Sequence, residues 1–543
     1  MNNIDENFKF EANRSNLKIS FERISFIFFI FFIITIIFTS KTIYLGFKKT
    51  NQTQTLKEKE KYRASIMDRN GNIIAKTVRV TNLGINPNQV INKEKLLISL
   101  RLIFPDKNFE KEVSGEKFFY VKKKISPKKL EKIKLLGEKS FKEEEKIARV
   151  YPNGNLFSHI LGQIDTDNNG VSGIEKSFDY ELTTSNKPIK LTLDTEIQYL
   201  TRQELLKFQE IFNSYGSSAI LMNINNGEIL SMVSLPDYDL NKRQNIFDKK
   251  FINRSTKGVY ELGSVFKTFT IAAGLQQNII KADTLFENLP KKIKCAGRSI
   301  SEYDMNIPSN LTAEEILIRS GNIGSIKIAQ KVGLENFKKF LEDLDLLYKT
   351  EFDIEEVGNP VPFKWGKCKL ATSAYGHGIT TTPLQLAKAY AIIANGGYKI
   401  KPSLIKKEKN FIKGEQIITK ENSNKINEIL RKIVTSEQGT ANLANIKGYQ
   451  IAGKTGTAQK SIEGKYTKKK INTFASIFPI SSPKYVLIVL LDEPKLSKTY
   501  VYNYYDGKDR KIIGTPFNTA GWTAVEVAKN IIEKIGPILA IKY

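Results

Sequence analysis

The longest apolar segment of the chain lies close to its N-terminus. Ile24–Ser40 carries no charge and consists mainly of isoleucine and phenylalanine, and apolar residues continue beyond Lys41 to Phe47. This length suits one membrane-spanning helix, because a lysine side chain near its end can extend to the membrane surface. The pattern therefore predicts a transmembrane anchor at residues 24–47, preceded by a short tail at residues 1–23.

Two other interpretations of this segment are weaker. A cleaved signal peptide has a shorter apolar core and a small-residue cleavage site, and no such site follows Phe38. A buried core helix is disfavoured by the apolar character on all sides at the extreme N-terminus. Lysine and arginine are denser after the segment than before it, so charge counting does not place the N-terminus in the cytoplasm.

The next part of the chain mixes short strands with a lysine-rich helix. A polar linker is expected at residues 50–61, a turn at Asn70-Gly71 and a helix start at Ser126-Pro127. No set of residues typical of catalysis stands out here. We therefore expect a non-catalytic domain over residues 48–190.

A second domain is predicted to begin near residue 191. Asp194 is placed to cap a helix with one apolar side. The apolar residues on that side are Ile197, Leu200, Leu205, Phe208 and Phe212. Ser218–Ile224 and Glu228–Val233 then flank Asn226-Gly227, which predicts a β-hairpin.

Strands are also expected at the other end of this domain. Asn472–Pro479 and Lys484–Leu491 form a second apolar pair, and Trp522–Ile535 is typical of a closing helix. Strands at both ends with helices between them predict an α+β fold over residues 191–543. Its mostly antiparallel sheet would be covered by helices.

Composition narrows the range of partners. The net charge is +27, but the basic residues are spread along the chain without a basic arm or a recognition motif, so we expect no nucleic-acid partner. Attraction to anionic lipid or cell-wall polymer stays open. The two cysteines, Cys295 and Cys368, are compatible with a disulfide in an oxidising compartment or with two separate thiols.

Three short motifs follow one another in the second domain. They are Ser264-Val-Phe-Lys267, Ser320-Gly-Asn322 and Lys454-Thr-Gly456. Each is weak alone, since Ser-x-x-Lys recurs at Ser126–Lys129 and Ser403–Lys406, and a helix cap, a turn or a solvated lysine explains each one separately. Their order within one domain is that of serine acyl-transfer enzymes.

The residue types suit that chemistry. A serine hydroxyl needs a neighbouring base, and Lys267 lies one helical turn after Ser264 in an apolar run. Burial lowers the pKa of a lysine, which can then act as a neutral base. With only two histidines, His159 and His377, a Ser-His-Asp arrangement is poorly supplied.

Backbone amides are expected to complete the site. The N–H of Ser264 near a helix start and the N–H of Thr457 on a strand are candidates for an oxyanion hole. Gly456 has no side chain and would let a substrate approach the strand closely. No metal ligand set and no cofactor motif stand out.

Longer segments around these motifs resemble the class B penicillin-binding proteins, and within them the septal peptidoglycan D,D-transpeptidases of the FtsI type. The resemblance covers nearly the whole chain beyond the anchor. The segments that carry it are Val150–Gly154, Gly173–Glu175, Val259–Lys267, Tyr375–Gln385, Ile451–Gln459 and Thr519–Trp522.

The resemblance implies a role for each motif residue. Ser264 is expected to be the acylated nucleophile and Lys267 its base. Ser320 and Lys454 are expected to relay a proton to the leaving D-alanine. Asn322 would hold the substrate amide and Thr455 the terminal carboxylate, with Gly456 and Thr457 beside them in the binding site.

The resemblance also implies a setting. It suggests a penicillin-binding/β-lactamase-like transpeptidase domain behind a pedestal similar to the dimerisation domain of penicillin-binding proteins. It suggests a single-pass inner-membrane protein with a cytoplasmic N-terminus and a periplasmic catalytic domain. Peptidoglycan stem peptides and β-lactam antibiotics are the expected ligands. Division-machinery proteins, including a partner glycosyltransferase, are the expected partners.

Several alternatives remain at this point. Gly321 stands where the motif often has Asp, at a position expected to face away from the chemistry. An elongation-type class B transpeptidase would share the same site. A membrane-bound β-lactam receptor or β-lactamase is disfavoured by the pedestal and by the lack of a Glu-x-x-Leu-Asn segment. An inactive scaffold is disfavoured by the intact serines and lysines.

Overall fold

A computed structural model describes residues 14–47, 62–242, 248–295, 297–407, 414–462, 464–505 and 509–543. The chain forms two units, Met1–Lys61 and Tyr62–Tyr543. The first unit contains one helix, α1 (Arg14–Phe47), which begins inside the segment expected as a tail. Within it, Arg23–Tyr44 is long and apolar enough to cross a membrane. The expected linker at residues 50–61 lies outside the described residues.

The second unit opens with the expected non-catalytic region. Its helices are α2 (Lys93–Ile103), α3 (Glu110–Ser114), α4 (Pro127–Lys134), α5 (Ser158–Leu161), α6 (Gly173–Ser177) and α7 (Asp179–Thr184), with the 3₁₀ turn η1 (Pro87–Gln89). Its strands are β1 (Ile66–Met67), β2 (Ile73–Ile85), β3 (Phe119–Ile125), β4 (Phe141–Val150) and β5 (Ile189–Lys190). They form one sheet in the order β3-β2-β1-β5, with β4 also paired to β2.

Local signals explain several of these boundaries. The β1–β2 turn falls at Asn70-Gly71 as expected, and Gly71 has a φ of 90° that glycine adopts easily. Helix α4 begins at Pro127 as expected, but the Ser126 side chain makes no capping hydrogen bond. One end of the sheet and α2–α4 enclose a separate small apolar core around Leu83, Leu100 and Val121.

The central sheet of the molecule is antiparallel, in the order β12-β13-β14-β6-β7. Its strands are β6 (Gly216–Asn223), β7 (Ile229–Leu235), β12 (Ala452–Ile462), β13 (Lys465–Phe478) and β14 (Tyr485–Asp492). Every residue of β7 and β14 is buried, because helices cover both faces of the sheet. Both strand pairs predicted from the apolar runs are present, and β14 pairs with β6 to join the two ends of the domain.

Nine further helices lie in the described part of residues 191–543. They are α8 (Thr195–Ile211), α9 (Lys267–Gln276), α10 (Ala313–Ile318), α11 (Asn322–Val332), α12 (Leu334–Asp343), α13 (Lys367–Ser373), α14 (Pro383–Ala394), α15 (Lys420–Thr435) and α16 (Ala524–Lys542). Three 3₁₀ turns are η2 (Lys249–Phe251), η3 (Gly263–Phe266) and η4 (Asn442–Ala444). Short strands that pair outside the central sheet are β8 (Leu285–Phe286), β9 (Lys292–Cys295), β10 (Arg298–Ser301), β11 (Leu311–Thr312), β15 (Val501–Tyr505) and β16 (Asp509–Ile513).

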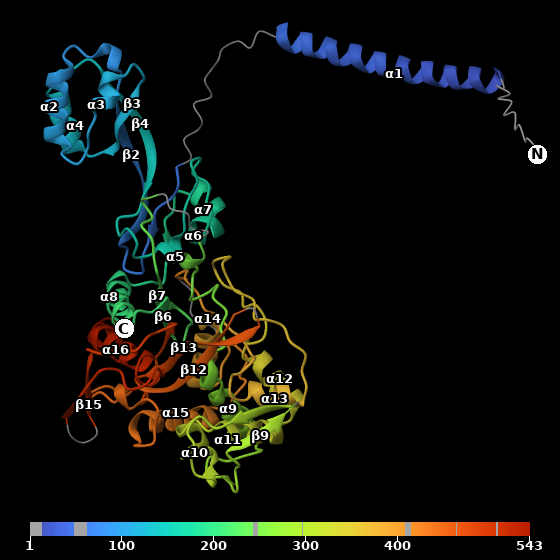
Figure 1. The fold of residues 1–543 in the computed structure, drawn as a ribbon, viewed down its shortest axis with the longest axis vertical. Helices are drawn as coiled ribbons and strands as arrows, with labels where there is room; N and C mark the ends of the chain where they lie inside the picture. The colour runs from blue at the N-terminus through green and yellow to red at the C-terminus, as the bar shows by residue number, and fades with distance from the viewer. Residues whose placement is uncertain are drawn as a thin grey trace, which may run out of the picture. The chain divides into compact units, whose positions relative to one another are not determined.

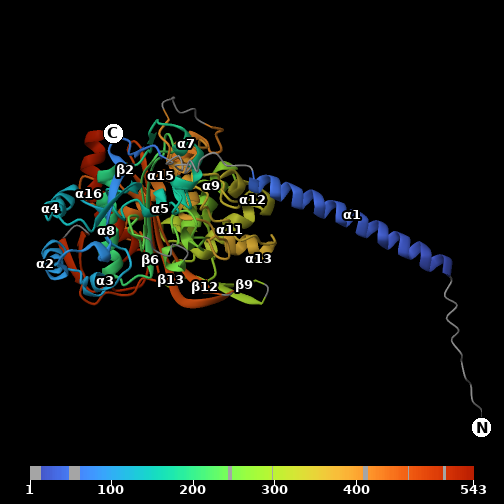
Figure 2. The ribbon, with the colours of Figure 1, turned by 90° about the horizontal axis from the view of Figure 1, so that it is seen from above.

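The helices form two layers around the central sheet. Helices α8 and α16 pack together on one face (Figure 1). Helices α9 and α11 lie on the other side, as the view from above also shows (Figure 2), and α14 packs on β6, β13 and β14. Asp194 caps α8 as predicted, since its side chain accepts the N–H groups of Glu196 and Ile197. The layers confirm the α+β fold.

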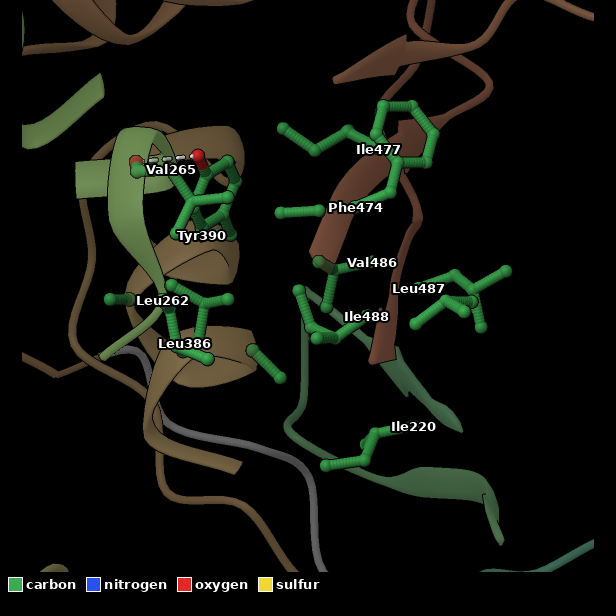
Figure 3. Packing of buried hydrophobic residues seen from close by; sticks show 14 of the residues in the cluster. Ile220, Leu262, Val265, Leu386, Tyr390, Phe474, Ile477, Val486, Leu487 and Ile488 are labelled. Atoms are coloured by element: carbon green, nitrogen blue, oxygen red, sulfur yellow. Dashed lines mark hydrogen bonds between the residues drawn. The ribbon is translucent and has the colours of Figure 1, made fainter. Parts of the chain in front are cut away.

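The nucleophile segment is fixed against the core behind it. Tyr390 on α14 donates a hydrogen bond to the Val265 carbonyl at 2.9 Å, and its hydroxyl also meets the Thr268 hydroxyl at 2.8 Å (Figure 3). Ile488 on β14 pairs with Ile220 on β6, so both side chains lie on the same face of the sheet. This apolar layer supports the turn that carries the first motif.

Candidate active site

The first motif lies on a turn that leads directly into a helix. Residues Gly263–Phe266 form the 3₁₀ turn η3, and α9 continues from Lys267. The expected helix start is therefore present, with a tighter first turn. Gly263 has a φ of 64°, and a Cβ there would stand 2.8 Å from the Thr457 carbonyl oxygen. Only glycine allows η3 to approach β12 this closely, and Ser264 follows it directly.

Lys267 is buried and points at the second motif. Its side chain is 1% exposed, and Nζ donates to the Ser320 carbonyl at 2.5 Å and to Ser320 Oγ at 3.1 Å. Burial lowers the pKa of Lys267 to about 7, although the negative charge of Glu302 acts in the opposite direction. The predicted lowering of this pKa therefore agrees with the geometry.

Lys454 reaches the same hydroxyl from the edge strand β12. It is fully buried, and Nζ donates to Ser320 Oγ at 2.9 Å and to the Thr455 carbonyl at 3.0 Å. Burial, and then the charge of Lys267, place its pKa well below the ordinary lysine value. The three motifs thus converge: two amines from distant parts of the chain share one serine oxygen.

The second motif combines a strained residue with a helix start. Ser320 has a φ of 59°, which is unusual for a residue with a side chain and typical of functional sites. Asn322 begins α11, and its Nδ2 donates to the Ser301 carbonyl at 2.9 Å. The Asn322 side chain is therefore anchored to the end of the β9–β10 hairpin.

The third motif needs one correction. A Cβ on Gly456 would stand 2.2 Å from the Leu262 carbonyl oxygen and 3.0 Å from Val265 Cγ1. The interpretation that Gly456 makes room for a substrate is wrong for its side-chain position, because the turn η3 fills that space. Its neighbours are held from other segments: Thr455 Oγ1 meets Thr440 Oγ1 at 2.7 Å, and Thr457 Oγ1 accepts the Ala520 N–H at 2.9 Å.

Sequence reasoning missed several residues that surround the motifs. Thr440 and Glu302 contact motif residues that lie 15 and 20 positions later in the sequence, and no local pattern distinguishes either residue. Glu261, three residues before Ser264, accepts the Gly378 N–H at 2.9 Å and the Tyr466 hydroxyl at 2.9 Å. The ring of His377 stacks between the ring of Tyr375, in the segment Tyr375–Gln385, and the ring of Tyr466 on β13. The resemblance of that segment was the available signal for this cluster.

The two cysteines form a disulfide. Cys295 at the end of β9 is bonded to Cys368 on α13, with a Cα–Cα distance of 5.6 Å. The question left open by the sequence is therefore answered in favour of the disulfide. It joins the β9–β10 hairpin to the helix beside the segment Tyr375–Gln385.

Chemically, the arrangement suits transfer of an acyl group. A lysine with a pKa of about 7 is partly neutral near neutral pH and can accept a proton from a hydroxyl. A second buried amine shares the Ser320 hydroxyl, so a proton has a short path between the two nitrogen atoms. The turn η3 packs on the edge strand, so the segments that carry Ser264 and Thr457 are neighbours.

Comparison with known proteins finds two family matches along the chain. Residues 217–518 match the penicillin-binding protein transpeptidase domain, and residues 58–205 match the penicillin-binding protein dimerisation domain.

Full-length relatives extend this match. The chain is 30% identical to the probable peptidoglycan D,D-transpeptidase FtsI of Caulobacter vibrioides, over 88% of this chain and 82% of that protein. It is 30% identical to the stage V sporulation protein D of Bacillus subtilis, over 80% and 75%. It is 27% identical to the peptidoglycan D,D-transpeptidase FtsI of Escherichia coli K12, over 81% and 80%. The chain therefore belongs to the class B penicillin-binding proteins, in the group of FtsI-type peptidoglycan D,D-transpeptidases.

Proposed function

We propose that this protein cross-links the stem peptides of peptidoglycan at the division septum through an ester on Ser264. The observation that carries the proposal is the shared contact of Lys267 and Lys454 with Ser320 Oγ, next to the turn that bears Ser264. The names of the relatives support the substrate class and the role in division.

In the first half of the reaction, Ser264 Oγ attacks the carbonyl carbon of the penultimate D-alanine. Its proton passes to the neutral Lys267 amine. The bond to the terminal D-alanine breaks, and the departing nitrogen takes a proton delivered through Ser320 and Lys454. The products are an ester on Ser264 and free D-alanine. In the second half, an amine of a neighbouring stem attacks the ester, and the serine regains its proton as the cross-link forms.

Substrate binding uses the residues around this path. We assign the substrate amide to Asn322 and the terminal carboxylate to Thr455, next to the buried amine of Lys454. The N–H groups of Ser264 and Thr457 would stabilise the oxyanion, and one such donor contributes about 3–4 kcal/mol to transition-state stabilisation. Gly456 contributes by letting η3 pack on β12, which sets the spacing of those two amides.

We also assign domains and a location. Residues 1–23 form a cytoplasmic tail, residues 24–47 the anchor, residues 48–190 the pedestal and residues 191–543 the transpeptidase domain. The apolar helix and the relatives fit a single-pass membrane protein. We place it in the inner membrane with the catalytic domain in the periplasm, where stem peptides are found. Partners would be division-machinery proteins, including a glycosyltransferase that supplies new glycan strands.

Covalent labelling tests the acyl transfer. Detergent-solubilised protein is incubated with a fluorescent penicillin, and the labelled peptide is mapped by mass spectrometry. We expect label on Ser264 in the natural protein and none in Ser264→Ala. Ser126→Ala is the matched control. Ser126 begins another Ser-x-x-Lys motif, and its side chain makes no capping hydrogen bond. Label that persists in Ser264→Ala would remove this serine from its role.

Depletion in cells tests the septal role. Filamentous cells support septal cross-linking, because division stops while elongation continues. Round cells would instead support the elongation-type alternative.

A further inference from the structure

Glu302 is a buried carboxylate outside the three motifs. It directly follows β10, and only 7% of the residue is exposed. A buried charged group needs strong partners, since an unpaired charge is costly away from water. The hydrogen-bond donors to this carboxylate therefore indicate its role.

Both oxygens of Glu302 hold the start of α11. Oε2 accepts the Asn322 N–H at 2.6 Å and Oε1 accepts the Ile323 N–H at 2.8 Å. The first amides of a helix lack partners within the helix, and the helix dipole favours a negative charge there. The carboxylate thus fixes the backbone of Asn322, while the Ser301 carbonyl next to it fixes the Asn322 side chain.

The same carboxylate acts on Lys267. Its negative charge raises the pKa of Lys267 against the larger lowering by burial. The pKa of Lys454 is lowered by burial and then by the charge of Lys267. The charge of Glu302 therefore bears on the first amine, and the charge of that amine bears on the second.

Gly321 lies close to this carboxylate. A Cβ at this position would stand 3.2 Å from Ile307 Cδ1 and at an ordinary contact distance of 3.8 Å from Glu302 Oε1. The middle position of the second motif is therefore a neighbour of the Glu302 carboxylate.

The hairpin that carries Glu302 is held by the disulfide. Strands β9 and β10 are paired from Cys295↔Arg298 to Lys292↔Ser301, so the hairpin ends one residue before Glu302. Cys295 ties its other end to Cys368 on α13, and α13 packs on α11. The hairpin and α13 are therefore covalently joined, and both lie against α11, the helix that begins at the second motif.

We propose that Glu302 is a positioning residue for acylation: it holds the start of α11, with Ser320 and Asn322, and adds a negative charge beside Lys267. The disulfide Cys295–Cys368 keeps the hairpin that carries it in place. This inference deepens the proposed function and rests on it.

The first test is Glu302→Gln in the full-length protein, with the rate of acylation by a fluorescent penicillin as the readout. We expect a rate about tenfold lower, because a charged hydrogen-bond acceptor is lost at a helix start. Glu287→Gln is the control, since Glu287 is an exposed glutamate in the same region. Thermal unfolding identifies variants that fail to fold, and Glu302→Asp then serves as a second variant that keeps the charge but shortens the reach.

The pH profile separates this role from simple structural support. Removing a negative charge lowers the pKa of Lys267, so the acid limb of the acylation rate should move to lower pH in Glu302→Gln. A general loosening would slow acylation at every pH without moving the limb. A variant with the natural rate, or a slower rate with an unchanged limb, would overturn the proposal.

The disulfide is tested by combining variants. The double variant Cys295→Ser, Cys368→Ser should be acylated more slowly than the natural protein. The same two changes should slow acylation little further in a protein that already carries Glu302→Gln, because both changes act through one carboxylate. Fully additive effects would overturn the role of the disulfide. The natural protein is the reference throughout: if it is not acylated, the proposed function fails, whereas acylation unaffected by Glu302→Gln overturns only this inference.

Discussion

Lys267 and Lys454 donate hydrogen bonds to the same atom, Ser320 Oγ, at 3.1 and 2.9 Å. Two ammonium groups around one oxygen would repel each other, so protonation of one amine disfavours protonation of the other. The protonation states of the two amines are therefore linked. This relationship links the acid–base chemistry of the site to its stability.

Acylation should depend on pH through Lys267. Its folded-state pKa of about 7 lies below the ordinary value of 10.5, so the neutral base is present above pH 7 and is lost as pH falls. We expect the acylation rate to reach a plateau above about pH 8 and to fall about tenfold per unit below pH 6. Stopped-flow acylation with circular dichroism at each pH measures this, and a flat rate from pH 5 to 8 would contradict the role of Lys267 as the base.

Lys267→Met should stabilise the fold while it abolishes acylation. Because the folded pKa is depressed, the unfolded chain binds more protons between about pH 7 and 10.5, and the stability of the natural protein rises with pH across that window. Methionine has no charge to bury, so we expect Lys267→Met to raise the free energy of unfolding by about 2–4 kcal/mol at pH 6 and by less at pH 10.

Chemical denaturation of the two proteins at both pH values measures the difference. Lys327→Met on α11 is the control, since this lysine is exposed and should change stability by under about 0.5 kcal/mol at either pH. A Lys267→Met protein that is less stable at pH 6 than the natural one would contradict a buried, depressed amine.

Gly456→Ala should damage the site through packing. The added Cβ would overlap the Leu262 carbonyl, so η3 and β12 must separate and the amides of Ser264 and Thr457 would move apart. We expect a loss of about 1–3 kcal/mol in stability and at least about a hundredfold loss in acylation. Gly366→Ala is the control, because no atom lies within 4 Å of a Cβ there. Equal acylation by the two variants would show that η3 tolerates the shift.

Helices and turns whose formation depends on neighbouring residues in the sequence could be predicted from short sequence patterns. The apolar run at Ile24–Ser40 specified a membrane-length helix, and Asn226-Gly227 specified the hairpin of β6 and β7, where Gly227 has a φ of 75°. The spacing of Ser264 and Lys267 placed both on one helical turn. The closing helix was predicted too short, since α16 continues through Pro537 to Lys542.

Contacts between distant segments could not be predicted in the same way. Thr440 meets Thr455 and Glu302 meets Asn322 only because the chain folds back on itself, and neither residue has a motif of its own. The role of Gly456 was misjudged for the same reason, since the atom that fills its side-chain position belongs to Leu262. The disulfide needed the same information, because two cysteines 73 residues apart carry no local signal of pairing.

Glu175, in one of the segments that carry the resemblance, is at the centre of a buried ion-pair network. Its Oε2 accepts Arg63 Nε at 2.8 Å and its Oε1 accepts Arg149 Nε at 2.8 Å, and all three side chains are buried. Tyr151 donates a further hydrogen bond to Oε1 at 3.2 Å. Glu175→Gln would leave two buried guanidinium groups without their shared counter-charge, and we expect a loss of about 3–5 kcal/mol in the free energy of unfolding.

Glu181→Gln is the matched control, because this glutamate lies on the neighbouring helix α7 and is exposed. Urea denaturation of the full-length protein in detergent measures both variants, with penicillin acylation as a second readout. Acylation by Glu175→Gln should stay near the natural rate while the folded form persists, since the network lies in the part of the chain that matches the dimerisation domain and not among the three motifs. A stability equal to that of the control would mean that water or Asp179, which also contacts Arg63 at 2.6 Å, compensates for the lost charge.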